Sequence, residues 1–289
     1  MSAMLKIRNL SFAIDGKPLF DNASAVIPTG HKVGIVGRNG TGKTSLFRLI
    51  REEWHADSGQ IEVPTECRIG GVDQEAPASD ISLLDTVLAA DHERHQLLAE
   101  ANTVTDADRL GQIHARLIDI DAYSGEARGA SILSGLGFDQ AAQARPCHEF
   151  SGGWRMRVAL AAVLFAQPDL LLLDEPTNYL DLEGAIWLES FIAKYKHTVL
   201  VISHDRTLLN RSVTGILHLT DCGLTYYTGR YDQFETERRM KLEQQESLRQ
   251  KQDAQRMHIQ AFVDRFRYCL LYTSPSPRDL STSRMPSSA

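Results

Sequence analysis

Three short runs of apolar residues, each ending in polar residues, stand out along the chain. The first contains the β-branched residues Val33, Ile35 and Val36, the second is the four leucines of residues 170–173, and the third is residues 197–205, HTVLVISHD. Continuous apolar runs of this length are typical of strands that are buried on both faces of a parallel sheet. The pattern therefore predicts an α/β domain in which the polar residues after the runs meet at one sheet edge.

Helical patterns lie between these runs. Residues 45–54 (SLFRLIREEW) and residues 151–160 (SGGWRMRVAL) each predict a helix at a glycine-containing turn. Residues 91–120 predict two helices, and the second begins with Thr105 and Asp108 in the spacing of a capping box.

The composition is that of a globular protein. The chain has 289 residues, 43% hydrophobic and 24% charged, enough to bury the core of one large domain or two smaller ones. No run approaches the roughly 18 to 20 apolar residues of a membrane span, and the start lacks the features of a signal peptide. We therefore expect a cytoplasmic protein without membrane insertion. The cysteines lack metal-ligand spacing, which predicts isolated reduced thiols at Cys67, Cys147, Cys222 and Cys269.

Residues 32–44, KVGIVGRNGTGKT, place a glycine-rich turn between the first predicted strand and the first predicted helix. Gly37 is followed by four residues and then by Gly42, Lys43 and Thr44, which is the spacing of a P-loop. The glycines allow successive backbone N–H groups to surround phosphate oxygens, and the helix start adds its positive dipole end. We expect the Lys43 ammonium to reach the β and γ phosphates and the Thr44 hydroxyl to hold Mg²⁺.

Two carboxylates follow the four leucines, and a histidine follows the third apolar run. Asp174 and Glu175 come at the carboxyl end of a predicted parallel strand, where α/β sheets place their ligands. We expect Asp174 to be the carboxylate on the Mg²⁺ side and Glu175 to polarise the attacking water. His204 is expected at the same edge as a neutral donor that senses the γ phosphate.

Ser151, Gly152 and Gly153 open the helix predicted in residues 151–160. A helix start opened by glycines is an anion site, because its first N–H groups are unpaired and its dipole end is positive. Nothing in this stretch binds a phosphate alone, so it predicts an anion that is supplied from outside.

Together with these motifs, SGGWRMR resembles the signature of ATP-binding-cassette (ABC) ATPases. The resemblance covers residues 4 to about 232. The motifs occur in the family's order, namely the P-loop residues Gly37, Arg38, Asn39, Gly40, Thr41, Gly42, Lys43, Thr44 and Ser45, then Gln74 in GGVDQE, the signature residues Ser151, Gly152 and Gly153, Asp174 and Glu175, Asp181 in the D-loop NYLDLE, and His204 in SHD.

The resemblance implies a fold and a set of roles. The fold is a P-loop NTPase cassette with a mixed sheet core, an antiparallel β subdomain and a helical subdomain. In the family two cassettes stack head to tail, and the signature of one caps the γ phosphate of the ATP on the other. The amides of residues 151–153 are thus expected to serve an ATP on another cassette. Gln74 is expected to join Thr44 and Asp174 at Mg²⁺ and to link the metal to the helical subdomain.

The residue that packs on adenine stays open between two candidates. Many cassettes place an aromatic residue near this point of the chain, and SFAIDGKPLF offers Phe12 or Ile14. Phe150 stands where leucine is commoner before the signature, which is a conservative change at a packing position.

Features outside these motifs resemble the ABC-F branch, whose members carry two cassettes on one chain and act on the ribosome. SGGWRMR with NYLDLEGAIWLE is similar to that branch, and the helices predicted in residues 91–120 match its short arm. YDQFETER and AFVDRFR are similar to the linker between its cassettes. The resemblance implies a cassette at residues 1–232 and the first linker helix at residues 233–268.

Residues 231–268 contain no proline or glycine and are rich in strong helix formers, so they predict one helix about 50 Å long. From Arg238 to Tyr268 there are eight Lys and Arg against four Asp and Glu, a balance of +4 in a chain of -6. From the charges alone, a solvated helix or a coiled-coil dimer is an equal alternative to RNA binding. With the resemblance, they imply contact with ribosomal RNA and tRNA, with little sequence preference.

Two other functions remain open from the sequence. A cassette subunit that drives a membrane transporter would share every motif, but it would leave the long basic helix without a role. A nucleotide-dependent assembly module would bind ATP without turnover. The motifs also do not separate a housekeeping translation factor from a protein that protects ribosomes against an antibiotic.

The helical pattern fails after Arg267. Residues 269–289 are rich in serine and proline, with two Ser-Pro steps, which predicts a disordered tail. Written as codons, CLLYTSPSPRD and SRMPSSA match a transposon-type sequencing adapter, so we interpret these residues as an assembly scar and exclude them from fold reasoning. We then expect the chain to be the amino-terminal half of a longer protein. Its hydrolysis is expected to be weak unless a second cassette or a second copy completes the site.

Overall fold

The computed structural model describes residues 3–72 and 76–273. Contacts divide the chain into two compact units, Met1–Phe234 and Glu235–Ala289. The first unit contains an antiparallel sheet, a mixed sheet and helices, which confirms the predicted α/β fold class.

A six-stranded sheet forms the centre of the first unit, in the order β5-β6-β7-β3-β8-β9. All neighbours in it are parallel except β9, which pairs antiparallel with β8. The three apolar runs form its middle strands, and all of β7 and the four leucines of β6 are buried. The strands are β3 (Lys32–Gly37), β5 (Ile69–Gly71), β6 (Leu170–Asp174), β7 (Thr198–Ile202), β8 (Gly215–Thr220) and β9 (Gly223–Thr228).

A smaller antiparallel sheet has the order β2-β1-β4, with β1 at Ala3–Ile14, β2 at Lys17–Pro28 and β4 at Ser58–Glu62. Alternate residues of β2 are buried, including Ala23, Ala25 and Ile27, so one face of this sheet covers a core. That core also contains the apolar side chains of α1 (Lys43–Ile50) and of the large sheet.

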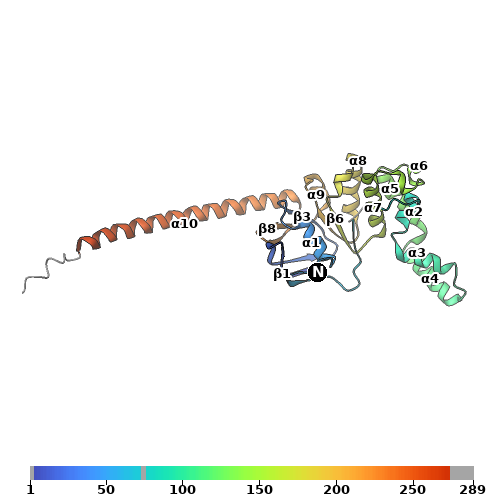
Figure 1. Cartoon of the computed structure of the whole chain (residues 1–289), viewed down its shortest axis with the longest axis horizontal. Coiled ribbons are helices and arrows are strands. Elements are labelled where there is room, and N and C mark those ends of the chain that lie inside the picture. Colours follow the sequence, from blue (N-terminus) through green and yellow to red (C-terminus); the bar gives the residue numbers. More distant parts are fainter. Residues whose placement is uncertain (1–2, 73–75, 274–289) are drawn as a thin grey trace, which may run out of the picture. The chain divides into compact units, whose positions relative to one another are not determined.

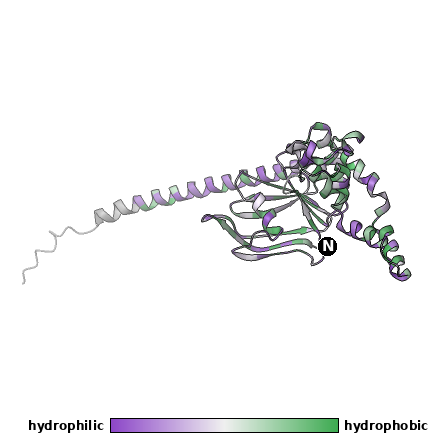
Figure 2. Cartoon of the chain, turned by 45° about the vertical axis from the view of Figure 1, so that its right-hand side comes forward, coloured by the Kyte–Doolittle hydropathy of each residue, from purple (hydrophilic) through white to green (hydrophobic). Residues whose placement is uncertain are grey.

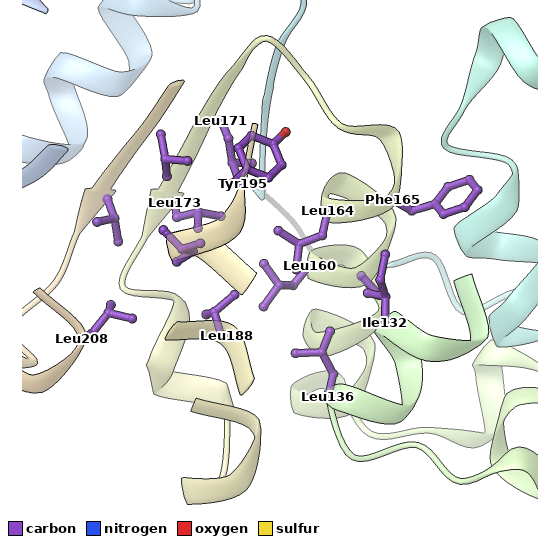
Figure 3. Close-up of a cluster of buried hydrophobic side chains, with 14 of the residues drawn as sticks. Ile132, Leu136, Leu160, Leu164, Phe165, Leu171, Leu173, Leu188, Tyr195 and Leu208 are labelled. Carbon is purple, nitrogen blue, oxygen red and sulfur yellow. The ribbon is translucent and has the colours of Figure 1, made fainter. Parts of the chain in front are cut away.

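Helices cover the other face of the large sheet. Leu160 and Leu164 of α7 share one buried cluster with Leu171 and Leu173 of β6 (Figure 3). The helices around this cluster are α2 (Leu83–Leu88), α5 (Gly125–Gly135), α6 (Gln140–Gln143), α7 (Gly152–Ala166), α8 (Leu182–Lys194) and α9 (Arg206–Ser212). Short 3-10 turns occur at Ala122–Ser124, Cys147–Glu149 and Pro176–Tyr179. We refer to residues 83–166, which include α2 to α7, as the helical subdomain.

Helix α1 is shorter than the pattern of residues 45–54 predicts, because it ends at Ile50. Its apolar face is complete at that point, and the chain leaves the helix through Glu52, which has a left-handed φ of 61°. This turn allows Trp54 to stack on Phe12, with ring centroids 5.7 Å apart. Tertiary packing of one aromatic residue thus outweighs the local helix preference.

Two helices, α3 (His92–Ala101) and α4 (Ala107–Asp119), project beyond α2 and α5 (Figure 1). The pair has a small core of its own, which includes Ile113, Leu117 and Ala122. The predicted capping box is wrong by one residue. The cap of α4 is Asp106, whose carboxylate accepts from the amide of Asp108 at 3.2 Å, and a carboxylate is an equally good cap to the predicted threonine hydroxyl.

The last helix, α10 (Tyr231–Thr273), begins in the first unit and is polar along most of its length (Figure 2). Phe234, near its start, is 4% exposed and packs on the rings of His218 and Tyr227, with centroids 5.1 and 5.0 Å apart. The helix continues five residues past the predicted boundary at residue 268, since the first proline of the tail is Pro275. The rest of the predicted disordered tail lies outside the described residues.

Candidate functional site

The glycine-rich turn between β3 and α1 has the backbone of a phosphate cradle. Gly40 and Gly42 have φ values of 78° and 95°, which favour glycine, and Gly42 is the residue before the first turn of α1. The Thr41 hydroxyl closes the turn by donating to the carbonyl oxygen of Arg38 at 2.9 Å. Gly37 ends β3, where a side chain would meet the carbonyl oxygen of Leu219 at 2.9 Å.

The Lys43 ammonium lies over this turn. Its Nζ donates to the carbonyl oxygens of Gly37 at 3.0 Å and Arg38 at 3.3 Å. The cation is therefore already held beside the amides of the loop, on weak neutral acceptors that phosphate oxygens can replace.

Thr44 connects α1 to the neighbouring part of the sheet. Its hydroxyl donates to Asp174 Oδ2 at 2.7 Å, across 130 positions of the sequence. A hydroxyl oxygen and a carboxylate oxygen that lie this close together are oxygen ligands of the kind that Mg²⁺ prefers, together with water and phosphate oxygens. The donor set thus fits Mg²⁺, and the described residues contain no cluster of three or more His, Cys, Asp or Glu that would favour another metal.

Glu175 has a strained backbone and a carboxylate oxygen that has no hydrogen-bond partner among the residues that the structure describes. Its φ of 45° lies in the left-handed region, which costs a non-glycine residue about 1 to 3 kcal/mol. Its Oε2 accepts from the backbone amide of His204 at 3.3 Å. Its Oε1 is buried and lies 3.5 Å from His204 Nε2, which is too long for a good hydrogen bond. This oxygen is thus available to accept a further hydrogen bond.

These groups line one cavity of about 780 Å³. Of the predicted residues, the following line it: Asn39, Gly40, Gly42, Lys43, Thr44, Ser45, Asp174, Glu175 and His204. Gly37, Arg38 and Thr41 form the turn beside it. Gln74 lies outside the described residues.

The cavity also separates the two candidates for adenine packing. Ile14 lines it together with Leu19, whereas Phe12 is buried against Trp54 on the core side of the small sheet. Positions 12 and 14 would lie on the same face of a regular strand, but the pairing of β1 with β2 shifts its register between Phe12 and Ala13, just before the strand ends at Ile14.

Sequence reasoning missed five residues that line the cavity, namely Asp15, Lys17, Leu19, Asn178 and Ile202. Lys17 adds a second cation, Leu19 adds an apolar wall, and Asn178 adds an amide beside the carboxylates. Asn178 stands two residues before the end of the run PTNYL, between two predicted motifs, which is a signal that could have found it. Lys17 and Leu19 follow a turn and carry no local signal.

The signature residues lie elsewhere. Ser151 is the residue before α7, its side chain makes no capping hydrogen bond, and none of residues 151–153 lines the cavity beside the P-loop. Ser151 lines a separate pocket of about 460 Å³ with Phe150 and Trp154. A side chain at Gly153 would meet nothing within 4 Å, so this helix start is open to a ligand from outside the cassette.

Asp181 begins α8 and joins it to the signature helix. Its Oδ1 accepts from the amide of Gly184 at 2.9 Å, and its Oδ2 accepts from Arg157 Nη1 at 3.1 Å. The Gly184 amide first, and the Arg157 guanidinium second, hold the pKa of this carboxyl below its usual range.

Comparison with protein families decides the identity of this arrangement. The model described as "ABC transporter" matches residues 20–178, which include the P-loop, the signature and both carboxylates. The chain belongs to the ABC transporter family. A second model of that family, for an extension of the cassette, matches residues 217–271, which include β9 and most of α10.

Relatives with similar sequences are ABC-F proteins, which confirms the predicted resemblance to that branch. The chain is 44% identical to "Probable ATP-binding protein YheS" of Haemophilus influenzae, over 91% of this chain and 42% of the relative. It is 39% identical to human "ATP-binding cassette sub-family F member 3", over 91% of this chain and 38% of the relative. The chain thus spans about two-fifths of the length of these relatives.

Solved structures of ABC ATPases share the fold. A chain described as "ATP binding subunit of ABC transporter" has a TM-score of 0.60 at 16% identity, covering 81% of this chain and 92% of that one. The ADP- and phosphate-bound dimer of the cassette MJ0796 has a TM-score of 0.57 at 19% identity, covering 78% of this chain and 98% of that one. Within the described residues, no helix has both the length and the apolar character to cross a bilayer. The described cysteines, Cys67, Cys147 and Cys222, are free thiols, as predicted.

Proposed function

We propose that the chain binds ATP with Mg²⁺ and hydrolyses it to ADP and phosphate. The observation that carries this proposal is the convergence of Lys43, Thr44, Asp174 and Glu175 at the cavity beside the P-loop. The same residues stand at the motif positions of the ABC ATPases, and the family match covers them.

Binding would begin at the loop amides and Lys43. The ammonium would exchange the carbonyl oxygens of Gly37 and Arg38 for β and γ phosphate oxygens, which are charged and therefore stronger acceptors. Ile14 and Leu19 would provide the apolar surface for the base. Ser45 and the amides of the loop would hold the remaining phosphate oxygens.

Thr44 and Asp174 would hold Mg²⁺, with Gln74 as the link to the helical subdomain. When bound, Mg²⁺ neutralises charge that develops on the phosphate oxygens. Thr44 and Asp174 would hold the ion in a fixed position, because the elements that carry them, α1 and β6, are packed in one core.

Glu175 would accept the proton of the attacking water. The buried Oε1 has no hydrogen-bond partner, while Oε2 is held by the His204 amide, so one oxygen is fixed and the other is free to accept. The His204 imidazole would then donate to the γ phosphate from the same edge.

The signature would act on an ATP held by a second cassette. Ser151, Gly152 and Gly153 form an open helix start that does not line the chain's own nucleotide cavity. Since the chain spans 42% of the length of YheS, we propose that the intact protein carries a second cassette, and that two copies of this chain can substitute for it. Hydrolysis by a lone copy would be reduced on the order of 10² to 10³-fold by the loss of the capping donors.

We further propose that the intact protein acts in the cytoplasm on the ribosome, as an ABC-F translation factor. This proposal is supported by similarity to ABC-F members and by the basic residues of α10, which give a charge balance of +4 from Arg238 to Tyr268. Long-range attraction to RNA phosphates is the property that such a surface supplies. A transporter-driving cassette has no use for this helix.

The test is Glu175→Gln, which keeps the shape of the side chain and removes its basicity. ATP hydrolysis is expected to fall by at least about 10²-fold, with ATP affinity unchanged. With ATP, the intact variant is expected to sediment with ribosomes, because its two cassettes would stay stacked around ATP that is not hydrolysed. Glu66→Gln, at an exposed position, is the control. Hydrolysis at the parent rate would refute the role of Glu175, and a variant that stays free of ribosomes would refute the ribosomal function.

A further inference from the structure

Arg157, the last residue of the SGGWRMR stretch, makes contacts that the roles expected of Ser151, Gly152 and Gly153 do not explain. Its Nε donates to the carbonyl oxygen of Tyr179 at 2.5 Å, and its Nη1 donates to Asp181 Oδ2 at 3.1 Å and to the carbonyl oxygen of Leu136 at 3.2 Å. Its Cζ lies 4.3 Å from the centre of the Trp154 ring. The side chain is 11% exposed. One guanidinium therefore contacts groups from three segments of the chain, one of which is the first turn of its own helix.

These segments belong to both halves of the cassette. Leu136 and Trp154 lie in the helical subdomain, after α5 and in the first turn of α7, whereas Tyr179 and Asp181 follow β6 of the large sheet. Gly137, next to the bound carbonyl, has a φ of 94° and would place a side-chain carbon 3.1 Å from Nη1. The backbone in this loop is thus shaped to leave room for Arg157.

The contacts also connect two functional segments. Trp154 stands in the helix turn that begins with the signature residue Ser151, and Asp181 is the D-loop residue whose carboxylate caps α8. Only a planar guanidinium offers donors in several fixed directions while its face stacks on an aromatic ring. A lysine at this position would reach one acceptor and would lose the others.

We propose that Arg157 is a positioning residue that fixes the signature turn relative to the D-loop within one cassette. The inference rests on the proposed association of two cassettes, in which the signature must meet the partner's nucleotide. With the two segments fixed beforehand, association does not have to order them, and the loss of conformational freedom on binding is smaller. Arg157 acts through the segments it holds; it does not line the cavity beside the P-loop, although it lines a neighbouring cavity that extends to Thr44 and Asp174.

The experiment compares Arg157→Met with Arg157→Lys, each in the Glu175→Gln chain. The control is Arg116→Met in the same chain, which removes an arginine of α4 that pairs with Glu93. Three quantities are measured: the affinity for a fluorescent ATP analogue, the ATP-driven association constant from sedimentation, and the amide exchange of residues 180–184. Arg157→Met is expected to keep nucleotide affinity, to lower the association constant on the order of 10-fold, and to speed the amide exchange. Arg157→Lys is expected to fall between, and Arg116→Met to match the parent.

Different results overturn different statements. Parent-like association of Arg157→Met, or a loss of nucleotide affinity equal to its loss of association, would overturn the positioning role, because the second result is that of a general folding defect. If Arg157→Met does not fold, Arg157→Lys is judged by the same criteria. If two copies of the parent chain do not associate when ATP is added, the proposed association of cassettes is refuted. The amide exchange of residues 180–184 then decides whether Arg157 holds the D-loop, and unchanged exchange in Arg157→Met would refute the positioning role too.

Discussion

The hydroxyl of Thr44 donates to Oδ2 of Asp174 at 2.7 Å, which joins the first turn of α1 to the end of β6. The two residues are 130 positions apart in sequence, and each follows its own local pattern, a P-loop and a buried strand. Because parallel strands end at the same sheet edge, two independent patterns produce one pair of hard oxygen donors. This pair is the most direct structural support for a Mg²⁺-dependent nucleotide site.

Asp174→Asn tests that pair. The amide keeps the size of the side chain and removes its charge, so we expect ATP affinity in the presence of Mg²⁺ to fall by at least about 10-fold, while affinity without Mg²⁺ changes little. Calorimetric titration with and without Mg²⁺ measures the difference. Asp221→Asn, at the exposed turn between β8 and β9, is the matched control. Equal losses with and without Mg²⁺ would show that Asp174 supports the fold of the site and does not bind the metal.

Alanine substitutions at Ile14 and Phe12 should have different effects, one on ATP affinity and the other on the free energy of unfolding. Ile14→Ala removes an apolar wall of the nucleotide cavity, and we expect ATP affinity to fall by about 5- to 20-fold with little change in unfolding. Phe12→Ala empties a buried position against Trp54, and we expect the free energy of unfolding to fall by about 3 to 5 kcal/mol. Analogue titration and urea unfolding of both variants measure the two effects. A larger loss of affinity in folded Phe12→Ala than in Ile14→Ala would contradict this assignment.

The sequence predicts the parts of this molecule that depend on local patterns. The P-loop follows from glycine spacing beside a β-branched strand, and the three middle strands follow from apolar runs with little alternation. The open signature turn at Ser151 follows from glycines at a helix start.

The misses depend on tertiary contacts. Helix α1 ends before Trp54, which packs on Phe12, and the choice between Phe12 and Ile14 depends on a register shift of β1 between Phe12 and Ala13. The contacts of Arg157 join three segments and leave no periodic trace in the sequence. The N-cap of α4 is Asp106 and not the predicted Thr105, because two adjacent residues are equally good caps and the sequence does not distinguish them.

Two helical glycines provide a matched pair for packing. A side-chain carbon at Gly135 of α5 would lie 2.1 Å from the Trp187 ring on α8, while one at Gly111 of α4 would meet nothing within 4 Å. We expect Gly135→Ala to destabilise the fold by about 1 to 3 kcal/mol, and Gly111→Ala to stabilise the arm by up to about 1 kcal/mol. Thermal and urea unfolding measure both. If the two substitutions change the free energy of unfolding equally, the Trp187 ring can move away from residue 135 at no cost in stability.

The basic side chains of α10 should set the salt dependence of ribosome binding. Replacing Arg249 and Lys251 by glutamine removes two exposed cations, so the slope of log affinity against log salt is expected to fall by up to about 2. Lys194 and Lys196, which are exposed at the end of α8 and just after it, provide a control with the same charge change. Affinity is measured by sedimentation between about 50 and about 200 mM salt. If the control lowers the slope as much as the α10 variant, RNA contact by α10 is refuted.

The Asp181 carboxylate should give a stability contribution with a defined pH dependence. Its pKa in the folded chain lies below the ordinary value of 3.8, so its contribution is present above that value and is lost as pH falls through the folded pKa. Because the side chain is 54% exposed, we expect Asp181→Asn to cost under about 1 kcal/mol, and asparagine can still cap α8. The difference in unfolding free energy from the parent should stay constant from about pH 8 to about pH 5 and shrink below about pH 4. Urea unfolding across this range measures it, with the exposed Asp253→Asn as control. A difference that grows as the pH falls would mean that the ionised carboxylate destabilises the fold, and the contact with Arg157 would then not be a favourable one.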